Sequence, residues 1–436
     1  MPLAFLPSVL EDRGHSSMKI ATALGVYYWT GFAGGALITL YKIWHLVFSG
    51  AEEETTSLAT AKNQIRFLIY GLLLGSVTLL WQALSPHCWV HTTCRFIQGL
   101  SGSFLFFYTF LLSVSLFKGQ QQVFAMTCAS IALNVAEVLG SFCGAMLFAW
   151  WGQRSVFGFL GIMSFINQFV LVAIMRSLTT ELRETEPPSS DAPLGSAEAL
   201  LLRGPDRIVR PPQFSKSGLK RLLALLTNTR MLVATLLITM AAVVKGSVEE
   251  MLPFHADHQW GFEPLVIGEM FFVIAVAYIG AAICAGKVWQ RLEGSHVAFS
   301  ALWLSLLGGA AWCVFAAASY HKDGRLLMIG LVLYGICLGL THTPAALMLA
   351  DTIEQEEGAA KDAANGIWNT MWEAGGSLGF LFGGFLADDY ASQFRLMSCY
   401  AVCCVCCAGL MLTVGWRVES KTKLIGDKDS QYGSVV

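Results

Sequence analysis

Charge is the property that this 436-residue sequence has least of. Asp, Glu, Lys and Arg make up 13% of the chain, about half of the roughly 25% that soluble globular proteins carry. This is too little to cover the two or three soluble domains that the length would suggest. The 28 basic and 30 acidic residues nearly cancel, which argues against a basic nucleic-acid-binding surface and an acidic disordered chain. Because hydrophobic residues account for 55%, the composition predicts a polytopic membrane protein.

Signatures of enzymes and of cofactor sites are absent as well. The chain has no P-loop, G-x-S-x-G, H-E-x-x-H or dinucleotide-binding fingerprint, and it does not open on a cleavable signal-peptide pattern. Five cysteines crowd the last hydrophobic run without a histidine or acidic neighbour: Cys399, Cys403, Cys404, Cys406 and Cys407. We interpret them as small apolar packing residues. The sequence therefore predicts no enzyme, no cofactor and no metal site.

Long hydrophobic runs are what the chain does contain. A helix needs about 20 mostly apolar residues to cross the hydrocarbon of a bilayer, and ten-residue alternating segments, which indicate membrane barrels, do not occur. Eleven runs qualify: 20–46, 67–84, 91–116, 122–150, 155–175, 229–253, 265–289, 297–320, 325–350, 363–387 and 394–416. The sequence predicts an all-α polytopic membrane protein with 11 spans.

One long hydrophilic segment divides these runs into five and six. Residues 176–228 carry six prolines and eight Lys or Arg residues, a composition that favours a flexible linker on the cytoplasmic side. We therefore expect an N-terminal half-bundle over 1–175, a six-helix half-bundle over 229–416 and a cytoplasmic tail over 417–436.

A short internal repeat relates the two parts. The segment GALITLYKIW at 35–44 matches GAAICAGKVW at 280–289 in its glycine, alanine, isoleucine, lysine and tryptophan. Leu-Pro at 6–7 then aligns with Leu-Pro at 252–253, which ends a full hydrophobic span. We expect two six-helix pseudo-repeats, the first without its first helix. The alternative is chance similarity between two helices rich in glycine and alanine.

Several motifs carry a resemblance to a known family. Arg95, Gln98 and Gly99 form an R-x-x-Q-G motif that resembles the fourth-helix signature of the major facilitator superfamily. NGIWNTMW at 365–372, the glycines that follow it, and the stretches 2–14 and 246–268 are similar to the vesicular amine and polyamine branch of its drug:proton antiporters. The resemblance implies a substrate site at the midplane between two halves and proton-coupled antiport of organic cations.

Charged residues inside the predicted spans are candidates for that site, because burying a charge in the bilayer costs at least about 2.5–3.5 kcal/mol. Lys245 and Glu249 are spaced i,i+4 and can pair on one helix face, whereas Glu250 points about 100° away. One interpretation is a self-neutralising pair near a helix end. The other is that Glu249 exchanges Lys245 for a proton or a cationic substrate. The resemblance favours the second, since an acidic residue four before the proline is implicated in amine transport.

The span 363–387 offers a second group. Trp368 and Trp372 share one column of the helix, and Asn369 and Glu373 share the next. Aromatic faces beside a carboxylate hold alkylammonium ions through cation–π contacts. Alternatively the tryptophans only fill helix contacts, and Glu373 alone reaches the cavity. The monoamine-type relatives carry an aspartate where this chain has Asn369, which leaves polyamines or other organic cations open.

Six further positions have open roles. Asp351 matches an aspartate of the monoamine carriers, but its acidic neighbours equally indicate a solvated helix end. His342 either relays protons or is simply hydrogen-bonded. Arg95 stays charged and needs a partner, for which Glu137 is the nearest candidate by sequence. Gly140 and Gly144 keep the glycines of the family's G-P-x-x-G pattern without its proline.

The sequence thus predicts a proton-coupled transporter of small organic cations, embedded as a monomer in a vesicle or plasma membrane. The partners are the substrate, protons and lipid, with no nucleic acid. A carrier of drugs or of neutral or anionic solutes, a non-transporting relative and, more remotely, an integral membrane enzyme are the alternatives.

Overall fold

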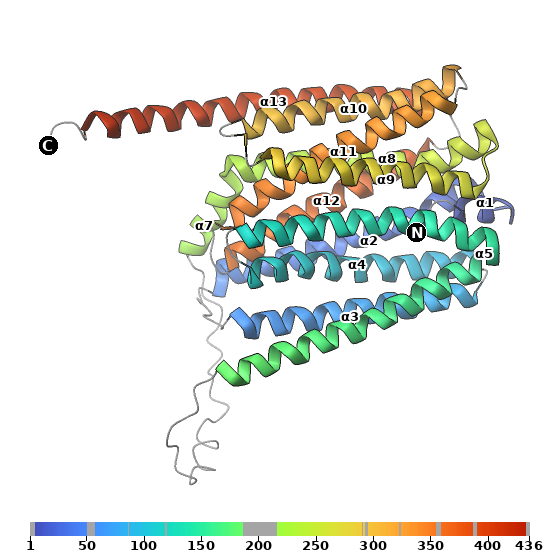
Figure 1. Cartoon of the computed structure of the whole chain (residues 1–436), viewed down its shortest axis with the longest axis horizontal. Coiled ribbons are helices and arrows are strands. Elements are labelled where there is room, and N and C mark those ends of the chain that lie inside the picture. The colour runs from blue at the N-terminus through green and yellow to red at the C-terminus, as the bar shows by residue number, and fades with distance from the viewer. Residues whose placement is uncertain are drawn as a thin grey trace, which may run out of the picture.

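All regular structure in the part of the chain that is described is helical (Figure 1). The computed structural model describes residues 5–49, 57–85, 87–117, 120–185, 216–289, 291–292, 295–321, 324–354, 359–386 and 390–432. In the first part of the chain the helices are α1 (Leu6–Glu11), α2 (Ser17–Trp44), the π-helical turn η2 (His45–Ser49), α3 (Ser57–Leu84), α4 (Cys88–Leu116) and α5 (Gln120–Thr185). In the second part they are α7 (Lys216–Thr227), α8 (Thr229–Trp260), α9 (Pro264–Trp289), α10 (His296–His321), α11 (Gly324–Glu354), α12 (Ala359–Phe385) and α13 (Tyr390–Tyr432).

Helix α5 is two membrane-length arms joined at one residue. Gly152 has φ 76° and ψ −178°, a backbone conformation that essentially only glycine adopts. The predicted runs 122–150 and 155–175 are these two arms. With the arms counted separately, the 11 predicted spans all correspond to long helices, and the predicted all-α polytopic membrane fold is confirmed.

Nine helices in the described ranges are long and apolar enough to cross a membrane, with α5 counted once. Helix α12 is not among them. Its polar and charged side chains, which include Asp362, Asn365, Asn369 and Glu373, lower its hydropathy although it lies among the other long helices (Figure 1). Helix α12 packs against α2 and α8, so its polar side chains are enclosed by protein.

Helix pairing repeats between the two parts of the bundle. Helix α4 packs against α2 and α3, and α3 packs against α5; in the same way α11 packs against α9 and α10, and α10 packs against α13. Helix α3 and the second arm of α5 lie at one edge of the bundle, and α10 and α13 at the opposite edge (Figure 1). The correspondence of α2 with α9 is the one that the sequence repeat predicts. The parts meet along two seams, α2 with α12 and the first arm of α5 with α9.

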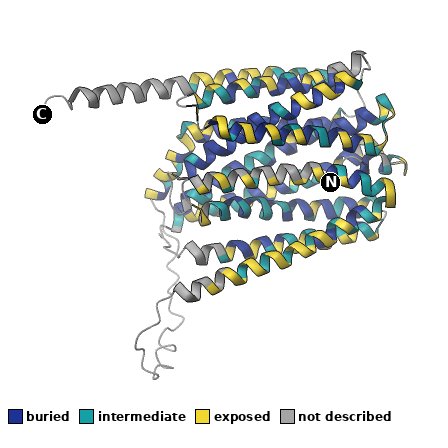
Figure 2. Ribbon diagram, viewed as in Figure 1, coloured by how far each residue is buried: buried dark blue, intermediate teal, exposed yellow. Residues whose placement is uncertain are grey.

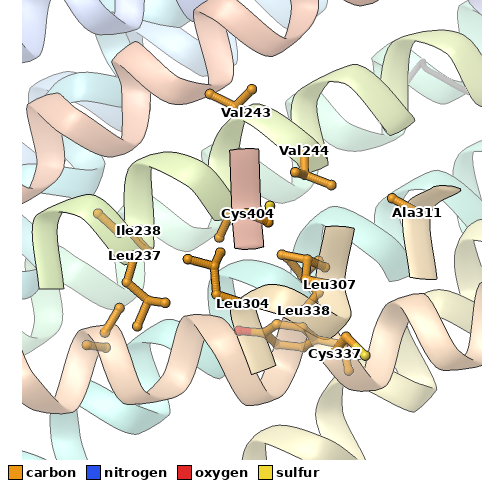
Figure 3. Close-up of a cluster of buried hydrophobic side chains, with 14 of the residues drawn as sticks. Leu237, Ile238, Val243, Val244, Leu304, Leu307, Ala311, Cys337, Leu338 and Cys404 are labelled. Carbon is orange, nitrogen blue, oxygen red and sulfur yellow. The ribbon is translucent and has the colours of Figure 1, made fainter. Parts of the chain in front are cut away.

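Helix α8 is the most deeply buried element. Every residue from 241 to 256 is buried, and buried positions gather on the central helices while exposed ones line the edges (Figure 2). A helix buried on all sides belongs to a core. Its apolar residues Leu237, Ile238 and Val244 pack with Leu304 and Leu307 of α10, and with residues of α11 and α13 that include Cys404 (Figure 3).

The segment 176–228 differs from the expected flexible linker at both of its described ends. The second arm of α5 continues to Thr185, and α7 occupies Lys216–Thr227. Helix α7 forms because its leucine-rich sequence packs on the bundle. Leu225 is buried, and Gly218 lies against the Leu46 carbonyl of η2. We call this side of the bundle the linker end. The opposite side, where α8 ends at Trp260 and α4 begins at Cys88, is the far end.

Candidate functional site

Polar side chains from both parts of the bundle gather near the helix midpoints. Lys245 of α8, His342 of α11, Trp372 and Glu373 of α12 and Tyr28 of α2 each lie within about one turn of the middle of their helices. Helix α12 packs against α2, α8 and α11, and α11 also packs against α8. The residues therefore share one level of the bundle, and we call them, together with Glu249 and Asn369, the central cluster.

An ion pair lies at the heart of the central cluster. Lys245 Nζ lies 2.6 Å from Glu249 Oε1, and the two residues are only 6% and 8% exposed. The pair is roughly 16 Å from the end of α8 at Trp260, so it is enclosed by protein rather than extended to an interface. The Tyr28 hydroxyl donates a hydrogen bond of 3.3 Å to Glu249 Oε2. One carboxylate thus contacts both halves of the molecule.

An aromatic surface faces the Lys245 ammonium. Lys245 Nζ lies 5.7 Å from the centre of a ring of Trp372, which is within cation–π range. Trp372 packs edge-on against His342 at 5.0 Å and stacks on Phe106 of α4 at 6.4 Å. Trp368, by contrast, is fully buried between Phe106 and Phe110. Of the two tryptophans predicted to form one surface, Trp372 contacts the cation and Trp368 fills the core.

The other two predicted residues of α12 lie at the seam between the halves. Glu373 is 8% exposed, and a Cβ added at Gly31 of α2 would lie 2.7 Å from its Oε2, so its carboxylate lies close against α2. Asn369 is 2% exposed, and its amide makes no hydrogen bond with any described residue. Buried amides are normally hydrogen-bonded, so Asn369 is an exception among the described residues. His342 Nδ1 pairs with the Tyr278 hydroxyl at 3.0 Å.

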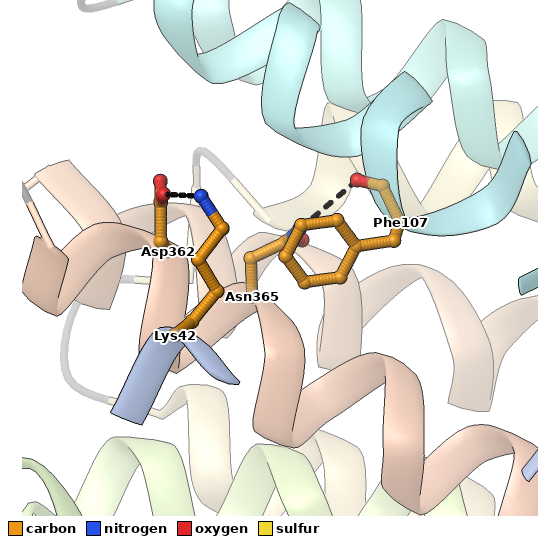
Figure 4. Close-up of polar contacts among 4 residues, drawn as sticks. All are labelled: Lys42, Phe107, Asp362 and Asn365. Carbon is orange, nitrogen blue, oxygen red and sulfur yellow. Dashed lines mark hydrogen bonds and ion pairs between the residues drawn. The ribbon is translucent and has the colours of Figure 1, made fainter. Parts of the chain in front are cut away.

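Two direct contacts close the linker end of this seam (Figure 4). Lys42 of α2 lies 2.5 Å from Asp362 of α12, and Asn365 Nδ2 donates to the Phe107 carbonyl of α4 at 3.2 Å. The hydroxyls of Thr39 and Thr370 add a third bond of 2.8 Å. These contacts hold α12 against the first half of the molecule on the linker side of the central cluster.

A cavity of about 720 Å³ opens at the far end. It is lined by Arg13, His15, Lys19, Thr22, His87, Cys88, Trp89 and Thr92. None of these belongs to the central cluster, and the lining is basic. An ammonium group is therefore better matched by the central cluster than by this cavity.

Two helical halves with polar groups at their shared midplane are the architecture of secondary transporters. The family model of the Major Facilitator Superfamily matches residues 57–379, and again residues 251–432. The chain belongs to the Major Facilitator Superfamily. Members of this superfamily are transporters rather than enzymes.

Solved structures agree on the fold of this superfamily chain. The crystal structure of the human organic anion transporter MFSD10 (TETRAN) matches with a TM-score of 0.55 and 17% identity, over 93% of this chain and 94% of that one. At this identity the likeness concerns the fold alone. No curated protein matches the chain.

The R-x-x-Q-G signature of the superfamily lies in the far-end part of α4. Arg95 is 9% exposed, and its guanidinium lies 5.9 Å from the Tyr27 ring centre. The expected contact with Glu137 cannot be described, since the side chain of Glu137 lies outside the described residues. Gln98 Nε2 donates to Gln82 Oε1 of α3 at 2.9 Å. The motif therefore ties α4 to both α2 and α3.

Glycines of the superfamily pattern lie where helices approach closely. Gly99 packs against the Tyr27 carbonyl of α2. Gly140 and Gly144 lie in the first arm of α5, and the next residue, Ala145, packs against Gly268 of α9. Asp351 does not join the central cluster. It is half-buried near the linker end of α11, roughly 14 Å beyond His342 along the helix.

Sequence patterns gave no sign of several of these contacts. Tyr28 follows another tyrosine, and nothing in the sequence distinguishes the one that reaches Glu249. Phe106 lies in a run of aromatic residues. Lys42 is a matched position of the internal repeat, but its partner Asp362 is 320 residues away in the sequence.

Proposed function

We propose that this superfamily transporter exchanges protons for small organic cations by alternating access. The observation that carries the proposal is the Glu249 carboxylate, which holds an ammonium group beside an aromatic ring while it accepts a hydrogen bond from the opposite half. Lys245 is the resident cation. An alkylammonium substrate presents the same chemistry to the same two groups.

Competition of cations for Glu249 couples proton movement to substrate movement. A buried ionised carboxylate is very costly without a partner, so a departing cation has to be replaced at once. Lys245, the substrate ammonium and a proton are the three candidates, and one carboxylate oxygen accommodates one of them at a time. Protonation of Glu249 releases Lys245 and weakens the bond from Tyr28, because a neutral acid is a poorer acceptor. Each exchange at Glu249 therefore changes a contact with the other half of the molecule.

The neighbouring groups favour cations that carry apolar parts or more than one charge. Trp372 and Phe106 offer aromatic faces to a hydrocarbon chain. Asn369 and Glu373 lie on the adjacent column of α12 and offer a second polar position. Polyamines and bulky organic amines have this combination. The linker and C-terminal tail are proposed to be cytoplasmic, in a vesicle or plasma membrane, with the monomer as the working unit.

A second candidate is transport of organic anions. Lys245 and Arg95 are both buried, and either guanidinium or ammonium binds a carboxylate. The matching human structure is named an organic anion transporter. In that case an anion would compete with Glu249 for Lys245, and cations would not inhibit uptake.

Uptake into proteoliposomes with an acidic interior tests the proposal. Spermidine, serotonin and choline analogues serve as probes, with a carboxylated dye as the anionic counterpart. We expect acid-driven uptake of at least one cation, inhibition by the others, and loss of uptake in Glu249→Gln. Glu263→Gln, the same change at an exposed glutamate after α8, is the matched control and keeps uptake.

Three results would overturn this reading. Uptake that is unchanged in Glu249→Gln removes the proposed role of the carboxylate. Uptake of the anionic dye alone, with Lys245→Met inactive, establishes the second candidate. Binding of a cation without any uptake identifies a non-transporting relative.

A further inference from the structure

A second carboxyl group, next to the one used above, is buried without a partner. Glu250 is 1% exposed, and neither of its carboxyl oxygens makes a hydrogen bond with a described residue. Lys245 is paired with Glu249, one residue before. Desolvation of an unpaired ionised carboxylate costs far more than protein stability can supply, so such a group becomes neutral instead. In this conformation Glu250 is a carboxylic acid.

Small uncharged residues surround Glu250. A Cβ added at Gly383 of α12 would lie 3.2 Å from Glu250 Cβ, and one added at Gly384 would lie 3.7 Å from Glu250 Oε1. The same added carbon at Gly384 would lie 2.7 Å from the Ala21 methyl of α2. Two adjacent glycines and an alanine thus form a notch around the carboxyl group. We call it the glycine notch.

The notch lies at the boundary between the halves, towards the far end. Ala21 is near the start of α2, whereas Glu250 and the two glycines lie in the last third of α8 and α12. Phe254, one turn further along α8, belongs to a buried cluster that also contains Phe5 and Phe157 of the first half. Glu250 is 1% exposed, so in this conformation water does not reach its carboxyl group.

The charged groups around the notch are few. Glu249 is the adjacent residue in the chain and is paired with Lys245, and two like charges so close together would repel each other. From α2 and α12, Ala21, Gly383 and Gly384 lie at the notch, and none of them is titratable. His255, further along α8, points elsewhere and pairs with Gln393 of α13. Two adjacent carboxyl groups therefore hold opposite protonation states, a pattern typical of proton-transfer sites.

We propose that Glu250 is a proton-binding site, separate from the substrate carboxylate Glu249, and that it couples its proton to closure of the far end. While the halves are closed over the glycine notch, the carboxyl group keeps its proton. When they part, an exposed glutamate gives that proton to water at neutral pH, and the halves close again only after a proton returns. Acid at the far end therefore favours closure.

The proposal rests on proton coupling in the proposed function, yet its first test needs no transport. Infrared difference spectra of the purified wild-type protein and of Glu250→Gln at neutral pH report the carboxylic acid directly. We expect the wild type to show a protonated carboxyl band that is missing in Glu250→Gln and present in Glu249→Gln and Glu263→Gln. The same band in Glu250→Gln would overturn the proposal, because another group would then be its source.

A second measurement covers the coupling to closure. The neutral side chain of Gln has the shape of the protonated acid, so Glu250→Gln and the apolar Glu250→Met both keep the closed packing. The stability of the wild type against thermal unfolding should fall as pH rises from 6 to 8, by up to tenfold in the folding equilibrium for each pH unit, and both variants should remove this dependence. An unchanged pH dependence in either variant would refute the coupling.

Uptake assays separate this proposal from the previous one. If Glu250→Gln loses uptake driven by the proton gradient but retains exchange of labelled for unlabelled cation, both proposals stand. If the infrared band is assigned to Glu250 while no cation is transported, the proton site stands and the proposed substrate class fails. If cation uptake in Glu250→Gln keeps its full proton dependence, Glu250 is not the coupling site.

Discussion

Replacement of Lys245 by methionine is the sharpest perturbation of the central cluster. Methionine keeps most of the length of the lysine side chain and removes its charge. The lost partner lies 2.6 Å from Glu249 in a buried setting, and breaking one side of such a pair costs about 3–5 kcal/mol. We therefore expect Lys245→Met to be strongly destabilised without ligand at neutral pH.

The same variant should be rescued by a cationic ligand. If substrate takes the place of Lys245, removal of the resident ammonium removes a competitor, and spermidine should bind at least about tenfold more tightly, a difference of about 1.4 kcal/mol. At a ligand concentration of 100 Kd, binding stabilises the folded state by about 2.7 kcal/mol. Thermal unfolding in detergent, followed by tryptophan fluorescence with and without spermidine, measures both effects. Acid should rescue the variant as well, because a proton neutralises Glu249.

A double-mutant cycle decides whether the two charges act together. Lys245→Met with Glu249→Gln leaves neither charge unpaired, so its stability should return to within about 1–2 kcal/mol of the wild type, without a response to spermidine. Lys220→Met, at an exposed lysine of α7, is the control for loss of one positive charge. Simple addition of the two single-mutant effects, or an equal response of the control to spermidine, would refute the reasoning.

Three other predictions concern the seams and the kink. Asp362→Asn breaks the ion pair between Lys42 and Asp362, whose side chains are 21% and 23% exposed. The free energy of unfolding should change by no more than about 1 kcal/mol, while hydrogen exchange of the backbone amides at the linker end of α12 should become faster. The charge reversal Lys42→Asp with Asp362→Lys should restore slow exchange. Gly99→Ala places a methyl group against the Tyr27 carbonyl and should cost about 1–3 kcal/mol in thermal unfolding, whereas Gly280→Ala, with open space around the added carbon, should cost little. Gly152→Ala forces a side chain into φ 76° and should cost about 1–3 kcal/mol, with faster exchange near the kink; unchanged unfolding would contradict the kink geometry.

Local sequence determined the class of this protein and the number of its long helices. A span needs only about 20 apolar residues in succession, and this property does not depend on what the helix packs against. For the same reason the sequence located both arms of α5 and paired Lys245 with Glu249, since residues four apart on a helix always share a face. The repeat at 35–44 and 280–289 also anticipated that α2 and α9 occupy equivalent places.

Tertiary structure alone decided how these helices form a site. Tyr28 reaches Glu249 from another half of the molecule, and Lys42 meets Asp362 across 320 residues. Trp368 and Trp372 have the same chemistry and the same helix column, yet one fills the core and the other faces an ammonium. Glu249 and Glu250 are neighbours in sequence, and only their packing gives one a cation and leaves the other without a partner among the described residues. Helix periodicity fixes directions within one helix, whereas distances between helices follow from the packing of side chains that the sequence does not pair.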